Sequence, residues 1–335
     1  MMDGSVNIVQ SVHVRTAARL HMGFFDLNGG LGRRFGGIGL GLDAPVTEIK
    51  VCRLEEAKLV EGTRLLNITS DANCDERANK IAQNYIRLFN LKDRFNLECL
   101  QLIPSHAGLG SGTQLALAIG CAINQLCGLN MSMQQLASVA QRGARSGVGV
   151  GTFMQGGVIV DGGRGKLTDI PPIIARAEFP AEWRVLLIFD DAEIGTHGEQ
   201  ETTAFSTLSD ATLASAEKLS HRVLMQALPA LAERDLIGFG AAIRELQAYT
   251  GDYFAPVQGG RYASKDVAQV LNYLEAQGVA CFGQSSWGPT GFAILASAAE
   301  AGQVIEQLKV QFLSLPTLRF QCCRGLNHGA NIQSY

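Results

Sequence analysis

The sequence predicts an α+β protein of two domains, on three observations. A strand-like segment at 95–103 leads through a glycine-rich loop into an apolar helical segment at 115–127. Prolines 171, 172 and 180 then interrupt the pattern. Beyond them, strand-like and helical segments alternate as in a β-α-β unit. We therefore expect an N-terminal domain at residues 1–180 and a C-terminal domain at residues 181–335.

Size and composition are those of an ordinary globular protein. The 335 residues are enough for two domains with separate cores, and 47% are hydrophobic while 18% are charged. A formal net charge of −3 offers no basic face for nucleic acid. The apolar stretch at 115–127 is too short to span a bilayer, and the start Met-Met-Asp-Gly-Ser does not resemble a signal peptide. We expect a cytoplasmic protein whose eight cysteines are reduced thiols, because they lack C-x-x-C spacing and most lie in apolar segments.

The loop Pro104–Thr113 is the first candidate site. The segment before it alternates apolar and polar residues as a half-buried strand does, and the segment after it is apolar at almost every position. Its glycines allow positive φ, and its main-chain N–H groups lie at a helix N-terminus, where about half a unit of positive charge is available to a phosphate. A tight strand-to-helix turn explains the glycine spacing equally well. The candidate phosphate-binding residues are Gly108, Leu109, Gly110, Ser111, Gly112 and Thr113.

A second polar cluster ends the first predicted strand, at 13–21. Arg19, His21, Asp26 and Asn28 are groups able to bind an anion or move a proton, and they fall within ten residues. A glycine-rich turn at 29–39, which contains Arg33, follows directly. A solvated hairpin explains the turn but does not explain the clustering of the polar residues.

Helical spacing predicts helices at 75–91 and at 132–145, the second opened by a capping box of Ser132 and Gln135. Alternating glycines at 147, 149 and 151 follow, and they suit either close backbone packing or a second wall of the ligand site. In the second half, helices are expected at 213–228, 235–248, 264–277 and 300–310, with strands at 184–189, 279–282 and 318–322.

Two polar segments of the second half are candidates for the same site. Five carboxylates follow the strand at 184–189, and among them Glu199 and Glu201 are able to hold Mg²⁺ through oxygen. The alternative is that they are first-turn residues favoured by a helix dipole. The loop at 283–290 is a second dense polar and glycine-rich loop, with candidate ligand-binding residues Ser285, Ser286, Gly288 and Thr290.

Several motifs resemble known families. Pro104, the segment Gly108–Ser111 and the small-residue helix after them resemble the central motif of the GHMP kinase superfamily. The segments 19–29 and 31–40 are similar to the N-terminal signature of β-ribofuranosylaminobenzene 5′-phosphate synthases, a branch of that superfamily that does not act as a kinase. The similarity continues in the expected order through 145–152, 156–163 and 283–290. It implies a ribosomal-protein-S5-like α/β domain followed by a ferredoxin-like domain.

The resemblance implies a reaction. These enzymes join phosphoribosyl pyrophosphate to 4-hydroxybenzoate or 4-aminobenzoate, with Mg²⁺, and release pyrophosphate and CO2 on the route to tetrahydromethanopterin-type carriers. Arg19 is then the first choice to clamp the benzoate carboxylate, with Arg33 fitting equally well, because a guanidinium binds a carboxylate through two hydrogen bonds. His21 and Asp26 are candidates for proton handling or positioning, and the resemblance implies a homodimer.

Two other functions are kept as alternatives. An ATP-dependent small-molecule kinase of the same superfamily is the first, although the segment at 147–160 contains no acidic residue that would take a proton from a substrate hydroxyl. A ligand-binding member without catalytic activity is the second.

Overall fold

Two long antiparallel strands, β1 (Ile8–Asp26) and β2 (Arg33–Leu54), form the centre of the structure. This computed structural model describes residues 8–54, 68–70, 76–193, 195, 208 and 211–335. Alternation along β1 buries Val12, Val14 and Leu20 on the faces that meet helices, as a period of two predicts. The strands that complete this eight-stranded sheet are β3 (Ile68–Ser70), β4 (Arg94–Gln101), β5 (Val158–Asp161), β6 (Arg164–Gly165), β7 (Ile173–Ala177) and β12 (Asn331–Ser334).

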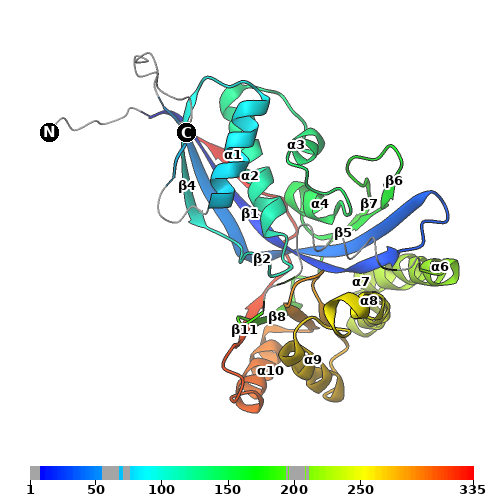
Figure 1. The fold of residues 1–335 in the computed structure, drawn as a ribbon. Coiled ribbons are helices and arrows are strands. Elements are labelled where there is room, and N and C mark those ends of the chain that lie inside the picture. Colours follow the sequence, from blue (N-terminus) through cyan, green and yellow to red (C-terminus); the bar gives the residue numbers. More distant parts are fainter. Residues whose placement is uncertain (1–7, 55–67, 71–75, 194, 196–207, 209–210) are drawn as a thin grey trace.

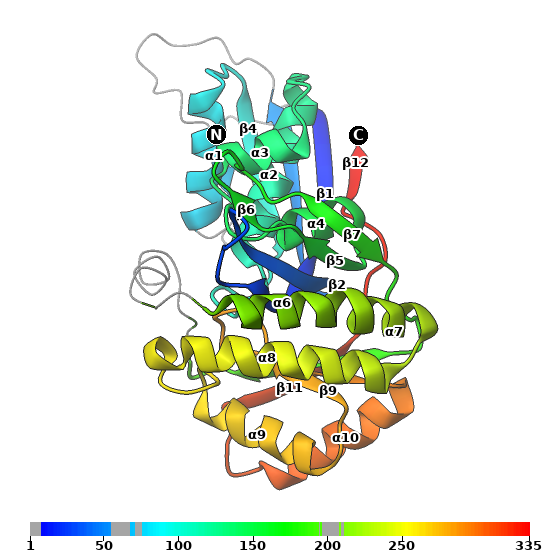
Figure 2. The same ribbon diagram turned by 90° about the vertical axis from the view of Figure 1, so that its right-hand side faces the viewer.

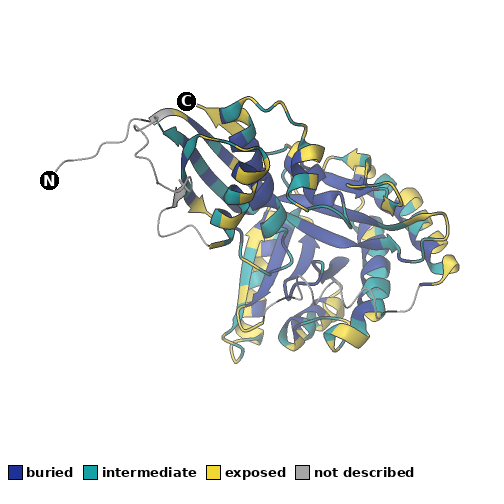
Figure 3. Ribbon diagram, turned by 45° about the horizontal axis from the view of Figure 1, so that its top comes forward, coloured by how far each residue is buried: buried dark blue, intermediate teal, exposed yellow. Residues whose placement is uncertain are grey.

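Helices cover one face of the first sheet (Figure 1). They are α1 (Glu76–Leu88), α2 (Ser111–Cys127), α3 (Met133–Val139) and α4 (Val148–Gln155). The predicted apolar helix is α2, and it is buried nearly all round because it lies between the sheet and helices α1, α3 and α4. Figure 3 shows the buried residues gathered on the strands and on the inner sides of the helices.

The predicted helix at 132–145 is shorter in the structure. Its capping box of Ser132 and Gln135 is confirmed, but α3 ends at Val139. The chain leaves the helical conformation because Gln141 has φ 53° and Gly143 has φ 80°. The arginines at 142 and 145 therefore lie in a loop and not on a helix.

The second sheet has four strands in the order β11-β8-β10-β9. It contains β8 (Arg184–Asp190), β9 (Cys281–Gln284), β10 (Gly291–Leu295) and β11 (Leu318–Cys323). Helices α9 (Lys265–Ala276) and α10 (Ala298–Gln311) pack on one face. The other face packs against a helical layer that also contacts β1, and Figure 2 shows this layer between the two sheets. Its elements are α6 (Leu213–Arg222), η1 (Val223–Ala227), α7 (Leu228–Glu233) and α8 (Leu236–Gln258).

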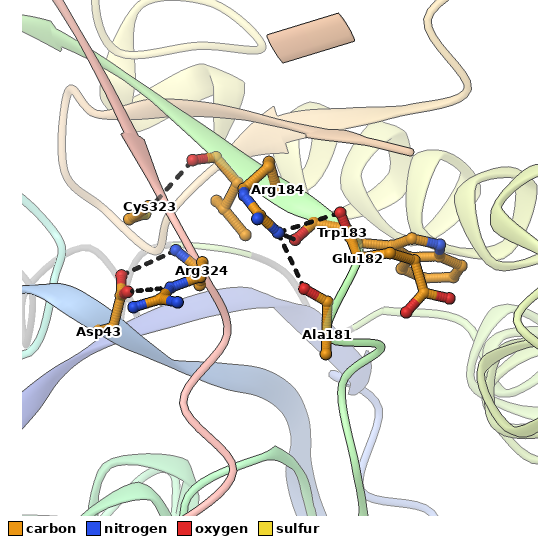
Figure 4. A network of polar contacts seen from close by, with 8 residues as sticks. Asp43, Ala181, Glu182, Trp183, Arg184, Cys323 and Arg324 are labelled. Carbon is orange, nitrogen blue, oxygen red and sulfur yellow. Dashed lines mark hydrogen bonds and ion pairs between the residues drawn. The ribbon is translucent and has the colours of Figure 1, made fainter. Parts of the chain in front are cut away.

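The two sheets are joined by more than one crossing of the chain. β7 ends at Ala177 in the first sheet and β8 begins at Arg184 in the second. After β11 the chain returns: the side chain and the amide of Arg324 each donate to the Asp43 carboxylate at 2.8 Å (Figure 4). The Asp43 amide in turn donates to the Arg324 carbonyl at 2.9 Å. β12 then pairs with β1. The C-terminal segment from Arg324 onward thus ties the second sheet to the first.

The cysteines follow the sequence prediction with one exception. Six are free thiols within the described ranges, whereas Cys99 is disulfide-bonded, so the expectation of reduced cysteines is wrong there. No helix in the part of the chain that the structure describes is long and apolar enough to cross a membrane.

Packing of α1 on α2 requires a glycine, which a pair of matched variants tests. A Cβ at Gly120 would lie 2.4 Å from the hydroxyl of Tyr85, and that hydroxyl is held by the carbonyls of Leu136 and Ala116. Gly120→Ala should therefore lower the free energy of unfolding by about 1–3 kcal/mol. Gly302→Ala, on α10 with nothing within 4 Å, should raise it by up to about 1 kcal/mol. Urea denaturation measures both, and equal effects would contradict the packing argument.

Candidate functional site

The predicted phosphate loop ends in an open helix N-terminus. Gly108 and Gly110 have φ 74° and 76°, and α2 begins at Ser111 without a side-chain cap. The amides of Thr113 and Gln114 bond back to the Gly110 carbonyl. Among the described residues, the amides of Gly110, Ser111 and Gly112 have no acceptor. These N–H groups are therefore free to bind an anion, as predicted for the loop.

Arg19 lies against this helix start. Its backbone amide donates to the Leu109 carbonyl at 2.9 Å, and its Nη1 donates to the Gly108 carbonyl at 3.1 Å. The guanidinium Nε is 3.4 Å from the position that a Cβ of Gly110 would take. The two predicted regions, the loop and the end of the first strand segment, thus meet in one site.

Arg142 is a site residue that the sequence analysis missed. Its guanidinium lies on the other side of the helix start, with Cζ and Nη1 both 3.4 Å from the position of a Gly112 Cβ. In the sequence it falls within the helix predicted at 132–145. The signal that could have revealed it is the glycine at 143, directly after an arginine at the end of a capped helix.

The loop between β9 and β10, the second candidate segment for the site, closes on the phosphate loop. The Ser285 hydroxyl donates to the Gly108 carbonyl at 2.9 Å and accepts the backbone N–H of His21 at 3.1 Å. Gly288 packs so tightly that a Cβ there would lie 2.3 Å from the Gly108 amide nitrogen. Ser286 donates its amide to the His21 carbonyl at 3.3 Å, and Thr290 is fully buried behind the loop.

His21 is a buried, neutral imidazole. Only 2% of it is exposed, and its Nδ1 accepts the Gly23 amide at 3.3 Å, which places the ring proton on Nε2. Burial lowers the pKa of His21 well below its ordinary value, and the nearby Arg19 charge lowers it further. The ring lies 4.6 Å from the Phe24 ring, centroid to centroid. At neutral pH His21 is therefore a hydrogen-bond donor and not a cation.

Asp161 is the first acidic residue after α3, and its carboxylate is fully engaged. One oxygen accepts the Ser146 hydroxyl at 2.8 Å and the Gly147 amide at 2.9 Å, and the other accepts the Gly163 amide at 2.9 Å. Burial raises the pKa of Asp161 while these hydrogen bonds oppose the rise. Its position fixes the start of α4. The glycines at 149 and 151 lie within α4 and serve close packing, against Thr113 and Ile159.

Three predicted site residues lie at the hairpin tip, away from the phosphate loop. Asp26 accepts the amides of Asn28 and Gly29, and the Asn28 side chain donates to the Ala211 carbonyl at 2.6 Å. Arg33 is exposed and donates to the carbonyls of residues 162 and 163 at 2.7 and 2.6 Å. Seven residues along a strand separate Arg19 from Asp26 by about 23 Å. The polar cluster seen in the sequence is therefore split between two places.

The predicted metal residues Glu199 and Glu201 lie outside the described residues. Gly195, a few positions before them, donates its amide to the His106 carbonyl of the phosphate loop at 3.1 Å. Two of the other three carboxylates of this segment have partners: Asp190 accepts the Ser264 hydroxyl at 2.7 Å, and Asp191 pairs with Arg319. Within the described ranges, no three His, Cys, Asp or Glu side chains form a metal-binding group.

Comparison with known proteins shows relatives along almost the whole chain. Residues 76–157 match the family described as GHMP kinases N terminal domain, and residues 227–313 match GHMP kinases C terminal. Over 313 residues the chain is 34% identical to the β-ribofuranosylphenol 5′-phosphate synthase of Archaeoglobus fulgidus, with 90% of this chain and 92% of the relative covered. The protein of that name from Methanocaldococcus jannaschii is 33% identical, with 84% and 88% covered.

A solved structure confirms the predicted fold class. The mevalonate pyrophosphate decarboxylase from Streptococcus pyogenes superposes with a TM-score of 0.65 over 96% of this chain and 99% of that chain. At 16% sequence identity this likeness concerns the fold alone. Together with the two GHMP domain matches, it confirms the expected two-part α+β architecture.

The neutral state of His21 predicts a pH dependence of stability. Below the pKa of an unfolded histidine, about 6.5, the unfolded chain binds a proton that the folded chain excludes from His21. Stability should therefore fall with decreasing pH below about 6.5, by up to about 1.4 kcal/mol per pH unit from this group. Urea denaturation at pH 8 and pH 5 should show a smaller loss for His21→Gln than for the natural protein. The control variant His221→Gln, at an exposed position, should lose as much stability between pH 8 and pH 5 as the natural protein. If His21→Gln also loses as much as the natural protein, His21 is charged in the folded state.

Proposed function

This chain belongs to the β-ribofuranosylphenol 5′-phosphate synthase family, and we propose that it condenses phosphoribosyl pyrophosphate with a para-substituted benzoate, releasing pyrophosphate and CO2. The main support for the proposal is that Arg19 packs against the phosphate loop, next to the amides that have no acceptor. An anion-binding helix start and an arginine for a second anion are what two negatively charged substrates require.

The diphosphate binds at the start of α2 in this proposal. As pyrophosphate leaves, negative charge builds on its oxygens, and fixed donors aimed at them stabilise the transition state. The amides of Gly110, Ser111 and Gly112 supply such donors, and Arg142 adds a charge beside them. Because these groups are held by the fold, they need no reorganisation when the bond breaks.

The acceptor carboxylate lies on the Arg19 side. A bond forms between the ribose anomeric carbon and the ring carbon that carries the carboxylate, and the pyrophosphate leaves with its bonding electrons. The ring carbon then loses CO2, and the electrons of the broken bond restore the aromatic ring. Arg19 orients the carboxylate until that step. Arg33 no longer fits this role equally well, because its donors hold two backbone carbonyls at the hairpin tip.

The proposal includes Mg²⁺, which Glu199 and Glu201 would hold together with the diphosphate. Magnesium commonly takes one or two carboxylates together with substrate phosphates and water, so two glutamates suffice. Bound there, it would neutralise charge on the leaving group. Support comes from Gly195, which places the chain just before these glutamates beside the phosphate loop. We also place the product on the route to tetrahydromethanopterin-type carriers and expect a cytoplasmic homodimer.

A kinase reaction has less support. The segment 147–160 supplies no carboxylate at the phosphate loop, and the carboxylate of Asp161 is occupied by the Ser146 hydroxyl and two amides. A general base for a substrate hydroxyl is thus missing from the described residues around α4.

A direct assay tests the proposal. Purified protein with Mg²⁺, phosphoribosyl pyrophosphate and a para-substituted benzoate should release pyrophosphate and CO2 in equal amounts, and chelation of Mg²⁺ should abolish the release. Enzymatic detection of pyrophosphate and carboxyl-labelled benzoate measure the two products. ADP formation from ATP without either product would support the kinase alternative. Binding of both substrates without turnover would support a non-catalytic member.

Substitution of Arg142 and substitution of Arg19 should have different effects, the first on pyrophosphate binding and the second on turnover. Arg142→Ala should weaken binding of inorganic pyrophosphate about 10- to 100-fold, because it removes a charge-assisted contact. Arg19→Ala should lower turnover about 100-fold with little change in thermal midpoint, since removing a fixed charge costs that much. Arg87→Ala, on the exposed side of α1, is the matched control. Calorimetry measures pyrophosphate binding, and steady-state kinetics measure turnover. A large loss of thermal stability in both arginine variants would show that the two arginines stabilise the fold and do not act on the substrates.

A further inference from the structure

A cleft between α8 and α9 lies outside the site described above, and Figure 2 shows β9 between these two helices. Its walls are one face of each helix: positions 241, 244, 245 and 248 of α8, and positions 265, 268, 272 and 275 of α9. The cleft has a volume of about 610 Å³, which is in the range of sites for small organic molecules. None of its lining residues belongs to the phosphate loop or to the loop between β9 and β10.

The cleft exists because small side chains face it. Ala241 and Ala248 on α8 and Ala268 on α9 line it, whereas the large apolar side chains of α9 pack on the second sheet. Gly259 follows α8, and a Cβ there would meet nothing within 4 Å. Phe282 of β9 also lines the cleft. The alanine methyl groups and this ring give the cleft an apolar surface on which a flat organic group is able to pack.

Two polar residues of the wall are held by the fold. The Gln247 side chain donates to the Met22 carbonyl at 2.7 Å and accepts the Gln284 amide at 2.8 Å. Arg261 donates to both carboxylate oxygens of Asp252, at 2.7 and 2.8 Å, which also balances its charge. The cleft is therefore formed before a ligand binds, and a preformed site lowers the entropic cost of binding.

Two cations of the cleft have no hydrogen-bond partner among the residues that the structure describes. The Nε of Arg244 is buried and unpaired, and its Nη1 lies 3.9 Å from a carboxylate oxygen of Glu275, beyond hydrogen-bond distance. Lys265, on the opposite wall, forms neither a hydrogen bond nor an ion pair there. The Cζ of Arg244 lies 5.8 Å from the centre of the Phe282 ring. The donors of Arg244 and Lys265 thus remain for a ligand.

The carboxylates of the cleft do not neutralise these two cations. Both oxygens of Glu245 are taken, one by Lys218 and the other by Arg222 at 2.7 Å. Glu275 is the remaining carboxylate of the lining, so it stands against two positive charges. The excess of positive charge favours an anion in the cleft. A phosphate monoester, which carries nearly two negative charges at pH 7, matches two cations better than a carboxylate does.

We propose that the cleft between α8 and α9 is a second ligand site, which binds the phosphate monoester of a ring-bearing molecule. The phosphate lies between Arg244 and Lys265, because a guanidinium and an ammonium both donate to phosphate oxygens. The ring lies on the alanines and on Phe282. Adenosine monophosphate (AMP) has this chemistry and is the probe. The site is independent of the proposed reaction, since it shares no residue with the phosphate loop.

Calorimetric titration with AMP tests the inference. The protein is first saturated with inorganic pyrophosphate, so that the phosphate loop is occupied. AMP should still bind at one site per chain. Adenosine, which lacks the phosphate, should show no binding, and ribose 5-phosphate, which lacks the ring, should bind at least tenfold more weakly than AMP. The absence of AMP binding, or AMP binding that pyrophosphate abolishes, would overturn the inference.

Variants locate the bound AMP. Arg244→Ala and Lys265→Ala should each weaken AMP binding at least tenfold. Ala268→Phe, which fills the cleft and removes no charge, should abolish it. Lys309→Ala, at an exposed position of α10, and Arg142→Ala, at the phosphate loop, should bind AMP as the natural protein does.

The same measurements separate this inference from the proposed reaction. Pyrophosphate binding and the thermal midpoint should be unchanged in the three cleft variants. Unchanged AMP affinity in Arg244→Ala and Lys265→Ala, or in Ala268→Phe, would overturn the inference. AMP binding that depends on these residues, in a protein that releases neither pyrophosphate nor CO2, sustains the inference and overturns only the proposed reaction.

Discussion

The close approach of three backbone segments at Ser285 is the contact on which the rest of the site depends. The Ser285 hydroxyl accepts the amide of His21 on β1 and donates to the carbonyl of Gly108. Side chains would hold these segments apart, and a Cβ at Gly108 would lie 2.2 Å from the Ser285 carbonyl oxygen. Glycine at 108 and 288 is thus a packing requirement, and at 108, where φ is 74°, it is a conformational one as well.

This contact sets the electrostatics of the site. Because β1 is held against the phosphate loop, the Arg19 charge lies beside the positive end of α2, and Arg142 faces the same turn. Like charges gathered in this way favour a bound anion and disfavour another cation. The imidazole of His21, close to Arg19 and buried, accordingly stays neutral and keeps its proton on Nε2. Arg19, which contributes positive charge to the anion site, and His21, a neutral hydrogen-bond donor, thus lie close together on β1.

The site is also a product of both domains. β1 and the phosphate loop come from the first sheet, whereas Ser285, Trp287 and Gly288 come from the loop between β9 and β10 of the second. The relative position of the sheets therefore decides whether the site forms. The Asp43–Arg324 contact and the pairing of β12 with β1 join the sheets a second time, after β7 and β8 have joined them once. Two connections restrain a hinge more than one does.

Features that depend on local chemistry were predictable from the sequence. Glycines with φ above zero in a strand-to-helix loop, an apolar helix after it and a capping box at Ser132 are set by neighbours a few residues apart, so their pattern predicts them. Which polar residues share a site depends on the three-dimensional fold. Arg19 and Asp26 are close in sequence but lie far apart along an extended strand, whereas Arg142 and Ser285 reach the phosphate loop from distant segments. The tautomer of His21 is set locally, by the Gly23 amide two residues away, whereas the burial of the ring and the contacts of Asp161 with Ser146 and Gly147 depend on segments that the fold brings together.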